Sequence, residues 1–452
     1  MADFNPTTMA TQLATAYTQP TQALLDRQSK VAQSTSTGLS KLQSALSAFK
    51  TALAGLSSSA SQGVTQYSAS ASDAAVLSAT ANSKAQPGST PLFVEQLATT
   101  HQVAYQDLPA VPAGPGSMSV QLANGNNFNV DLASADSDGD GTLSQTEIAR
   151  AINTSAAGQV TAMVVTVGGQ TQLMLSSGTS GAGGKITLNT SGLPAGALRT
   201  ALEDPTRRKE LVAAQDAVVW LGAKDSGVRL QQGSNTLTAI EGVSVTLKKA
   251  QAAGEAPVTL TVGRDDSATS AKLQGFVDAY NTLEKALDEL TAVGKDGATP
   301  GAFASDAGVR ALRDRLANLL RQDFGGGNLR TLGVSADRTG ALSLDKTKLG
   351  KALTKDPALL DTVMGNASLS APAGLLGGFD KLVEPWTNNV NGQIKQRRGS
   401  VETQQKAISN RQARLDVQYS QAYDRYLKQF TQLQNLQSQM GQTGGMFSAL
   451  ST

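Results

Sequence analysis

Apolar residues recur at heptad spacing near both ends of this chain. In the N-terminal part they follow one another at steps of three and four residues: Leu39, Leu42, Leu46, Phe49, Leu53 and Leu56. These steps place every apolar side chain on one face of an α-helix, as at the a and d positions of a coiled coil. An isolated helix with such a narrow seam is marginal in water, because the seam stays unburied. The pattern therefore predicts a helix that must find a partner.

The C-terminal part repeats this pattern over a longer stretch that is rich in glutamine. Its apolar residues stand at helical or heptad spacing: Val390, Ile394, Val401, Ile408, Leu415, Tyr419, Ala422, Tyr426, Leu433, Leu436 and Met440. A helix from Arg397 to Met440 would be roughly 65 Å long. We expect Gly441, Gly444 and Gly445 to end it.

The first 38 residues carry a sparser apolar stripe, formed by Leu13, Tyr17, Leu24 and Val31. Pro20 lies inside this stripe, where proline starts a new helix or breaks one. The two ends of the chain have two alternatives. They pair as a helical hairpin within one chain, or they are disordered in the free monomer and become ordered on assembly. We favour the second. The predicted oligomerisation positions are then Leu39, Leu42, Leu46, Phe49, Leu53, Ile408, Leu415, Tyr419, Tyr426, Leu433, Leu436 and Met440.

The middle of the chain, from about 76 to 265, has the pattern of a β-rich region. Its runs alternate apolar with polar residues and are separated by Gly, Asn or Asp, which favours strands at 92–97, 117–122, 128–132, 160–167, 172–176, 185–188, 218–221, 243–248 and 258–262. Two short helices are expected at 143–153 and 205–214. Asp204 would cap the second, with Pro205 at its first position.

Helical periodicity returns from about 268 to 365, which gives the order helix, sheet, helix. We therefore predict an α+β multidomain fold, in which both termini form a helical coiled-coil stalk and β-rich head domains are nested between them. The predicted domains are an N-terminal helical segment (1–38), a helical stalk (39–75 and 268–404), a β-rich head (76–112 and 215–267), an inserted β-rich head with short helices (113–214) and a C-terminal coiled-coil segment (405–452).

Composition excludes several classes of function. The chain has no cysteine, so thiol catalysis, disulfides and Cys-ligated metals are excluded. Its single histidine, His101, forms no catalytic pair with another histidine, and we interpret it as a strand-end or surface residue. The 38 basic and 36 acidic residues balance, which argues against a nucleic-acid partner. No long apolar run predicts a membrane span, and the first residues lack the pattern of a cleaved signal peptide. We expect no enzymatic activity.

One local motif suggests a metal site. The run DSDGDGTLSQTE at 136–147 fits the calcium-loop pattern D-x-[DN]-x-[DN]-G-x5-E. Oxygen ligands would come from Asp136, Asp138, Asp140, Thr142, Ser144 and Glu147. The alternative is an Asp/Gly-rich strand-to-helix turn in which an Asp side chain caps the helix. No other cofactor is indicated, and calcium is not required for the predicted fold.

Several motifs, in this order, resemble the flagellar hook-associated protein 2 family, the filament cap. They are PGSTPLFVEQLA at 87–98, LSQTEIARAIN at 143–153 with GQVTA at 158–162, AQDA at 214–217, SN at 234–235, GVSVTL at 242–247, AYN at 279–281, LGV at 332–334, GALSLD at 340–345 with DP at 356–357, and the helix 408–440. The resemblance covers nearly the whole chain.

This resemblance implies a protein that leaves the cell unfolded through the flagellar type III channel. Such proteins form a homo-oligomer of about five subunits at the distal filament tip, where they help flagellin to fold and insert. The implied partners are flagellin, hook-filament junction proteins and a cytosolic export chaperone. Two other functions stay open from sequence: an adhesin whose β-rich head binds host or matrix ligands, and another flagellar axial protein.

Overall fold

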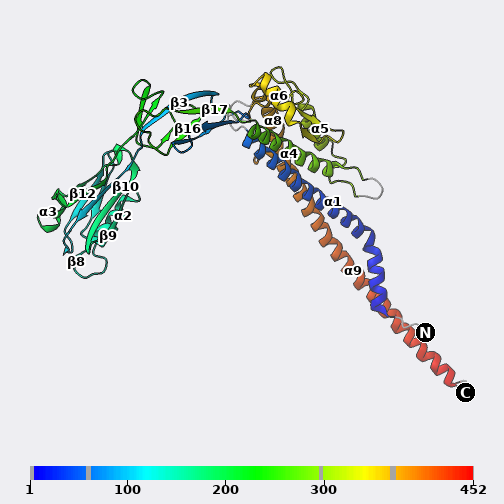
Figure 1. Ribbon diagram of the computed structural model, residues 1–452. Coiled ribbons are helices and arrows are strands. Elements are labelled where there is room, and N and C mark those ends of the chain that lie inside the picture. Colours follow the sequence, from blue (N-terminus) through cyan, green and yellow to red (C-terminus); the bar gives the residue numbers. More distant parts are fainter. Residues whose placement is uncertain (1–4, 57–62, 295–298, 367–372, 451–452) are drawn as a thin grey trace. The chain divides into compact units, whose positions relative to one another are not determined.

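The computed structural model describes residues 5–56, 63–294, 299–366 and 373–450. The chain divides into two compact units, a helical unit made of residues 1–64 and 269–452, and a β unit made of residues 65–268. The β unit is thus inserted between the two segments that form the helical unit (Figure 1). This order confirms the α+β class with terminal helices and nested sheets. The finer division into five domains stays a prediction.

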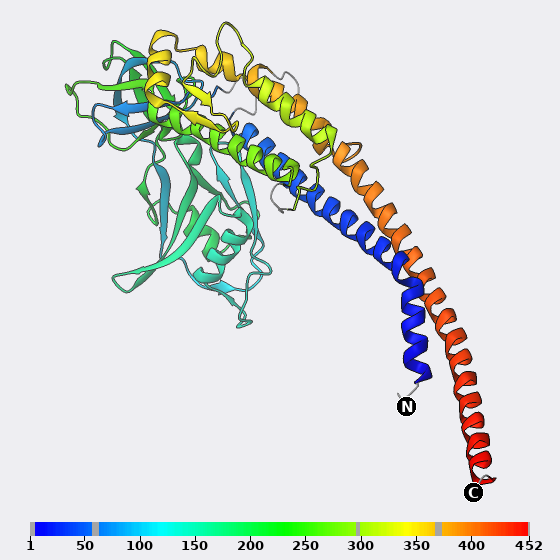
Figure 2. The same cartoon turned by 90° about the vertical axis from the view of Figure 1, so that its right-hand side faces the viewer.

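Two long helices dominate the helical unit. They are α1 (Pro6–Leu56) and α9 (Gln393–Leu450), and they run side by side in both views (Figure 2). Shorter elements complete the unit: α4 (Asp266–Thr291), α5 (Ala307–Leu319), the hairpin β18 (Val334–Ala336) and β19 (Leu342–Leu344), α6 (Lys346–Lys355), α7 (Leu359–Met364) and α8 (Gly374–Thr387). Among the described residues, no helix combines the length and the apolar character that crossing a membrane requires.

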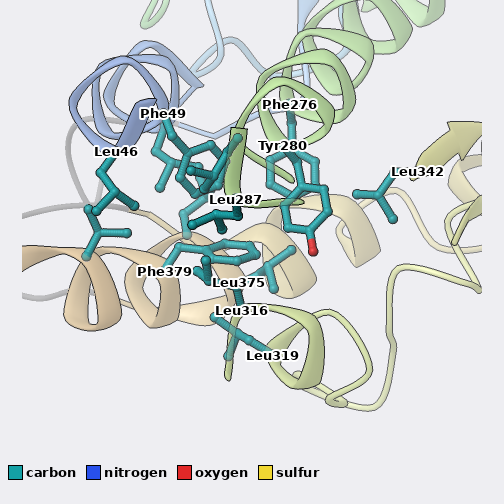
Figure 3. Packing of buried hydrophobic residues seen from close by; sticks show 14 of the residues in the cluster. Leu46, Phe49, Phe276, Tyr280, Leu287, Leu316, Leu319, Leu342, Leu375 and Phe379 are labelled. Carbon is teal, nitrogen blue, oxygen red and sulfur yellow. The ribbon is translucent and has the colours of Figure 1, made fainter. Parts of the chain in front are cut away.

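The core of the helical unit forms where α1, α4, α5 and α8 meet (Figure 3). The Phe49 and Phe379 rings pack edge to face, with their centroids 5.2 Å apart, and the Phe276 ring lies 5.9 Å from Phe379. The heptad residues predicted from sequence, Leu39, Leu42, Leu46, Phe49 and Leu53, are all buried in this cluster. Their seam is therefore covered within the chain itself.

The N-terminal half of α1 packs through a different face from the stripe that sequence singled out. Its buried positions lie one residue further along and are mostly small: Ala10, Ala14, Thr18, Leu25 and Ala32. The large residues Leu13, Tyr17, Leu24 and Val31 are between 41% and 61% exposed. Small side chains let two helix backbones approach closely, so the alanine face suits the contact with α9 and the larger stripe faces outward.

Two expectations about helix ends are wrong. Helix α1 is continuous through Pro20, which is exposed, so a lost backbone hydrogen bond is tolerated where α9 supports the helix. Helix α9 begins after Val390 and continues through Gly441 and Gly444 to Leu450. Glycine weakens a helix interior by only about 1 kcal/mol relative to alanine, and no proline follows to stop it.

Part of the β unit is built on a five-stranded antiparallel sheet in the order β1-β17-β3-β13-β14. Its strands are β1 (Tyr67–Ala71), β3 (Gly88–Gln96), β13 (Ala217–Leu221), β14 (Val228–Gln232) and β17 (Val258–Arg264). A three-stranded sheet of β2 (Leu77–Ala81), β15 (Thr236–Leu237) and β16 (Val243–Leu247) shares its aliphatic core.

The other part holds a four-stranded sheet in the order β12-β4-β10-β9. Its strands are β4 (Thr100–Gln106), β9 (Val160–Val167), β10 (Gln170–Ser180) and β12 (Arg208–Val212). With them lie β6 (Ser117–Leu122), β7 (Asn127–Asp131) and β11 (Ile186–Asn189), the short pair β5 (Val111–Pro112) and β8 (Thr142–Leu143), and the helices α2 (Gln145–Ala156) and α3 (Ala197–Glu203). All except the edge strand β12 contribute residues to a second, mostly aliphatic core.

The helix expected at 205–214 is wrong. Residues Arg208–Val212 form the edge strand β12, which pairs with β4, and Asp204 lies at the C-terminal end of α3 instead of capping a helix. The charged residues of this segment suit a sheet edge as well as a helix surface, so local pattern could not separate the two. The helix expected at 143–153 is present, beginning at Gln145 after a capping box formed by Ser144 and Glu147.

Candidate functional site: the terminal helix pair and the acidic loop

The free ends of α1 and α9 carry no charge. No charged residue occurs from Asn5 to Leu25 or after Lys428. Both ends nevertheless expose large apolar side chains: Met9, Leu13, Tyr17 and Leu24 on α1, and Leu433, Leu436, Met440 and Met446 on α9. Such a surface buries readily, because no charged group has to lose its water. Contiguous exposed apolar surface marks an interaction site.

Along α9 the contact with α1 weakens toward the C-terminus. Leu415 is buried, and Ile408, Tyr419 and Tyr426 are half-buried. The Tyr419 ring stacks on Tyr423, at a centroid distance of 6.5 Å. From Thr431 to Gly444 every residue is exposed, since α9 continues past the start of α1 (Figure 2). Leu433, Leu436 and Met440 are therefore unpaired in the single chain, and their role in oligomerisation stays a prediction.

Polar contacts between the two helices join amide, hydroxyl and guanidinium groups, and Arg411 donates to Gln28 at 3.4 Å. Gln412 donates to Gln22 at 2.8 Å, and Arg398 donates to Ser40 at 3.0 Å. The structure thus contains the hairpin that sequence left as one alternative. It does not test whether these ends are ordered in the free monomer.

The root of the pair, where α9 enters the helical unit, is held by charged groups. Arg397 donates to the Asp306 carboxylate at 2.6 Å, and its guanidinium lies 5.2 Å from the Trp386 ring centroid. Asp306 also caps α5 by accepting from the Val309 N–H at 2.9 Å. Burial acts to raise the pKa of Asp306, but the Val309 hydrogen bond and Arg397 outweigh it and lower that pKa.

A second ionic contact ties α1 to α8. The Lys50 ammonium pairs with the Glu384 carboxylate and lies 3.6 Å from Asp380. The hydrogen bond from Lys50 lowers the pKa of Glu384. The root of the helix pair is therefore fixed by packing and charge together, whereas the N-terminal part of α1 packs mainly through small side chains and has no charged residue up to Leu25.

The acidic loop predicted from sequence lies between β7 and α2. Carboxylate oxygens of Asp136, Asp138 and Glu147 lie within 4.8 Å of one another. Asp140 does not join this group, because its carboxylate accepts from the N–H of Thr142 at 2.7 Å and from its hydroxyl at 2.6 Å. The structure thus brings three of the six predicted ligands together as carboxylates. No segment before the loop forms an entering helix, since β7 precedes it.

Glu147 is only 3% exposed, and both oxygens of its carboxylate accept hydrogen bonds. One oxygen accepts from the Ser137 N–H at 2.7 Å, and the other accepts from the Ser144 N–H at 2.9 Å. The Ser144 N–H, followed by the Ser137 N–H, lowers the pKa of Glu147 to about 2. Glu147 and Ser144 therefore cap α2, whereas the alternative drawn from sequence expected an Asp side chain as the cap. The carboxylates of Asp136, Asp138 and Glu147 nevertheless lie close together, and calcium binding stays a prediction.

His101 lies near the start of a strand, as one of its two expected positions, but it does not lie on the surface. It is the second residue of β4 and fully buried. Its Nδ1 accepts from the Ile186 N–H at 3.0 Å, so the proton sits on Nε2, which faces Glu210 at 2.9 Å. A neutral histidine thus links β4 to β11 and β12. Sequence alternation alone could not reveal this, because both partners come from distant strands.

A helix pair with a charge-free tip, together with a β unit inserted in sequence between the segments of the helical unit, defines a multidomain protein of the α+β class. Comparison with known proteins gives its family. The family pattern described as "Flagellar hook-associated protein 2 N-terminus" matches residues 3–101, and the pattern described as "Flagellar hook-associated protein 2 C-terminus" matches residues 214–442. The chain belongs to the flagellar hook-associated protein 2 family.

Individual relatives agree with this assignment. The chain is 37% identical to the lateral flagellar hook-associated protein 2 of Vibrio parahaemolyticus, over 84% of this chain and 85% of that protein. It is 29% identical to the B-type flagellar hook-associated protein 2 of Pseudomonas aeruginosa, over 89% of this chain and 86% of that protein. The crystal structure of the D1-D2-D3 domains of the flagellar cap protein from Escherichia coli has the same fold, with a TM-score of 0.64 and 24% identity over 80% of this chain and 99% of that chain.

Family membership makes this chain a hook-associated protein of the bacterial flagellum. The resemblance stated from its motifs is confirmed. The two alternatives, a surface-binding module and another axial protein, are not favoured by these relatives.

Proposed function

We propose that this chain caps the distal tip of the filament, where it promotes the folding and insertion of exported flagellin. The observation that carries the proposal is the uncharged, apolar free end of the α1–α9 pair. A helix pair of this kind gains by burial between neighbouring subunits and has no charge to desolvate. The pair thus plugs into the growing end, while the rigid root carries the β unit.

In this proposal the chain acts by confinement and steric templating, and it catalyses no bond-making step. It is exported through the flagellar channel with a cytosolic chaperone and assembles as a ring of about five copies. It then contacts flagellin and the hook-filament junction proteins. The absence of cysteine supports passage as an unfolded chain, because nothing can cross-link during export.

A deletion strain tests the function. Loss of the gene should give flagellin in the medium and no filaments, and the intact gene should restore filament growth and motility. Normal filaments in the deletion strain would contradict the cap assignment.

The role of the tip needs a variant with a matched control. Leu436→Glu places a charge on the exposed free end of α9, and should prevent ring assembly and filament growth without unfolding the chain. Val228→Glu places the same charge on β14 in the β unit, at a residue that is likewise exposed, and should leave both intact. Electron microscopy of the purified proteins shows rings or their absence. Rings formed equally by both variants would contradict the proposed role of the tip.

A second proposal concerns the loop at 136–147, which we propose to bind calcium as a local structural ligand. Two observations favour it: the complete loop motif in sequence, and the approach of the Asp136, Asp138 and Glu147 carboxylates in space. Calcium should raise the unfolding temperature of the wild type and give a calorimetric binding signal that magnesium does not reproduce.

The loop proposal has a simple control. Asp138→Asn keeps the turn bond to Asp140 but removes one carboxylate, so it should abolish the calcium signal. Asp131→Asn alters an exposed turn-capping carboxylate outside the loop and should leave the signal unchanged. No heat up to millimolar calcium would refute the site.

A further inference from the structure

Strand β9 has one unpaired side. It lies at the edge of the four-stranded sheet and pairs only with β10. In an antiparallel ladder, alternate residues direct their N–H and C=O groups to opposite sides of the strand. Ala162 identifies the outward set, because its N–H donates to the Asn153 side chain at 2.7 Å and its C=O accepts from that side chain at 2.8 Å. Val164 and Thr166 therefore point outward as well.

The outward groups of Val164 and Thr166 have no protein partner. Residues 63–294 are all described, and no hydrogen bond among them reaches these two N–H or two C=O groups. The Asn153 side chain bonds both backbone groups of Ala162, as a neighbouring strand would, but it reaches no other residue of β9. The open run thus begins after Ala162 and ends at the Gly168–Gly169 turn.

The two edges of this sheet differ in their protection against strand pairing. The opposite edge, β12, presents Arg208, Lys209 and Glu210, and charges of this kind oppose pairing with another chain. The sequence of β9, VTAMVVTV, contains no charge, proline or glycine. Its side chains also remain partly accessible, with Met163 and Val167 exposed. The β9 edge is therefore open in both its backbone and its side chains.

The size of the open edge decides what it can hold. From Val164 to Thr166 it spans roughly 7 Å, at about 3.4 Å per residue. Stable association of folded proteins buries about 1,200 Å² or more. An edge this short can bury only a small part of that area, which argues against a second folded copy as its occupant. It suits an extended chain that binds briefly, through backbone bonds that are tolerant of sequence.

We propose that the outer edge of β9 is a transient strand-addition site for an extended, uncharged polypeptide segment. This inference rests on the proposed cap function, because an exported client that has not yet folded would supply such a segment. Backbone pairing at Val164 and Thr166 holds the segment, and the lack of charge on β9 selects against charged segments. The shortness of the run allows release.

Peptide binding by the full-length protein tests the site. The probe is a fluorescein-labelled ten-residue peptide of alternating Val and Thr or Gln, and a matched peptide carries Lys at every second position. Anisotropy should show binding of the uncharged peptide and at least tenfold weaker binding of the charged one. Thr166→Pro removes one of the two outward donors and should weaken binding about fivefold or more. Proline is tolerated where an edge strand points its N–H away from the sheet.

Three further variants guard against misfolding and chance effects. Thr166→Lys keeps the backbone but adds a charge to the edge, and should also weaken binding. Thr166→Ser keeps both the backbone N–H and the uncharged edge, and should bind the peptide as the wild type does. Asn153→Ala uncovers Ala162 and should tighten binding severalfold. Circular dichroism identifies any variant that has lost its fold.

The outcomes separate this site from the cap function. Undetectable peptide binding by the wild type at millimolar concentration, or equal binding by wild type and folded Thr166→Pro, would overturn the strand-addition site. A dimer of the wild type that Thr166→Pro abolishes would also overturn it, since the occupant would then be a second copy. Filament growth in cells complemented with the wild-type gene reports on the cap function independently of these results.

Discussion

The two halves of α1 show how one helix can serve two purposes. From Leu39 to Leu56 its seam consists of large residues packed into an aromatic and aliphatic core with α4, α5 and α8. From Pro6 to Ala32 its inward face is mostly Ala and Thr with one leucine, Leu25, and its other large residues, such as Leu13, Tyr17 and Leu24, are exposed. The C-terminal half of α1 therefore stabilises the fold of the chain itself. The N-terminal half leaves large apolar side chains exposed, where they can contact other molecules.

The comparison teaches that heptad spacing alone does not reveal which apolar residues are buried. Their burial depends on which element packs against that face of the helix. Leu46 and Leu24 are the same residue type on the same helix, yet the first is fully buried and the second is half exposed. Substitutions in the two halves should therefore affect different properties. Substitutions at the root should change the free energy of unfolding, and substitutions at the free end should change ring assembly.

The largest expected effect is at the root. Phe49→Ala removes a ring that contacts both Phe379 and Tyr280, and should lower the free energy of unfolding of the helical unit by about 3–5 kcal/mol. Denaturant unfolding followed by circular dichroism measures this. A loss below about 1 kcal/mol would show that α1 does not anchor the unit.

The next effect is at Pro20, between the two halves. Pro20→Ala restores a backbone donor inside α1 and should stabilise the N-terminal half of the helix by up to about 3 kcal/mol. Hydrogen exchange should slow between Thr11 and Leu25 and remain unchanged from Leu39 onward. Faster exchange in the N-terminal half would mean that Pro20 is required for packing against α9.

A smaller effect is expected at Asp306, with a definite pH dependence. Its carboxylate pKa is lowered in the folded chain, so its charge contributes stability above the unfolded value of about 3.9 and loses that contribution as the pH falls below it. Asp306→Asn keeps the helix cap but removes the charge that Arg397 binds, and should cost about 1 kcal/mol at pH 7.

Unfolding curves at pH 7 and near pH 2.5 check the Asp306 prediction. The difference between wild type and Asp306→Asn should shrink toward zero at the lower pH. A difference that stays constant would mean that geometry, and not charge, makes this contact.

The smallest effect on stability is at the free ends. Removing residues 1–38 and 405–452 should leave a folded core, because the root seam begins at Leu39 and the main core lies outside the removed segments. Ring assembly should become weaker. Circular dichroism and electron microscopy check the two parts, and global unfolding of the truncated chain would show that the free ends support the root.

Much of the architecture could be predicted from the amino-acid order alone. The heptad steps from Leu39 to Leu56 and the alternation at 117–122 and 160–167 locate elements that the structure contains. These signals are local, because a repeat of two or of about 3.5 residues reports which face of an element is apolar. Ser144 and Glu147 likewise mark a helix start through contacts only three residues apart.

The failures have a common cause in contacts between distant residues. Arg208–Val212 is a strand because β4 pairs with it, and β4 is about 100 residues away. His101 is buried because β11 and β12 enclose it. The acidic loop was found in sequence, but which of its carboxylates approach one another depends on the local fold of the turn.

What the sequence alone determined is therefore the periodicity of each element, the nested order of helices and sheets, and the lack of charge at both ends. What only the tertiary structure decided is which face of each element is covered. On α1 the small face at Ala10 and Ala14 meets α9, and the larger stripe at Tyr17 and Leu24 does not. The physical reason is that burial depends on the shape of the neighbour, and close approach of two helices favours small side chains over more hydrophobic ones.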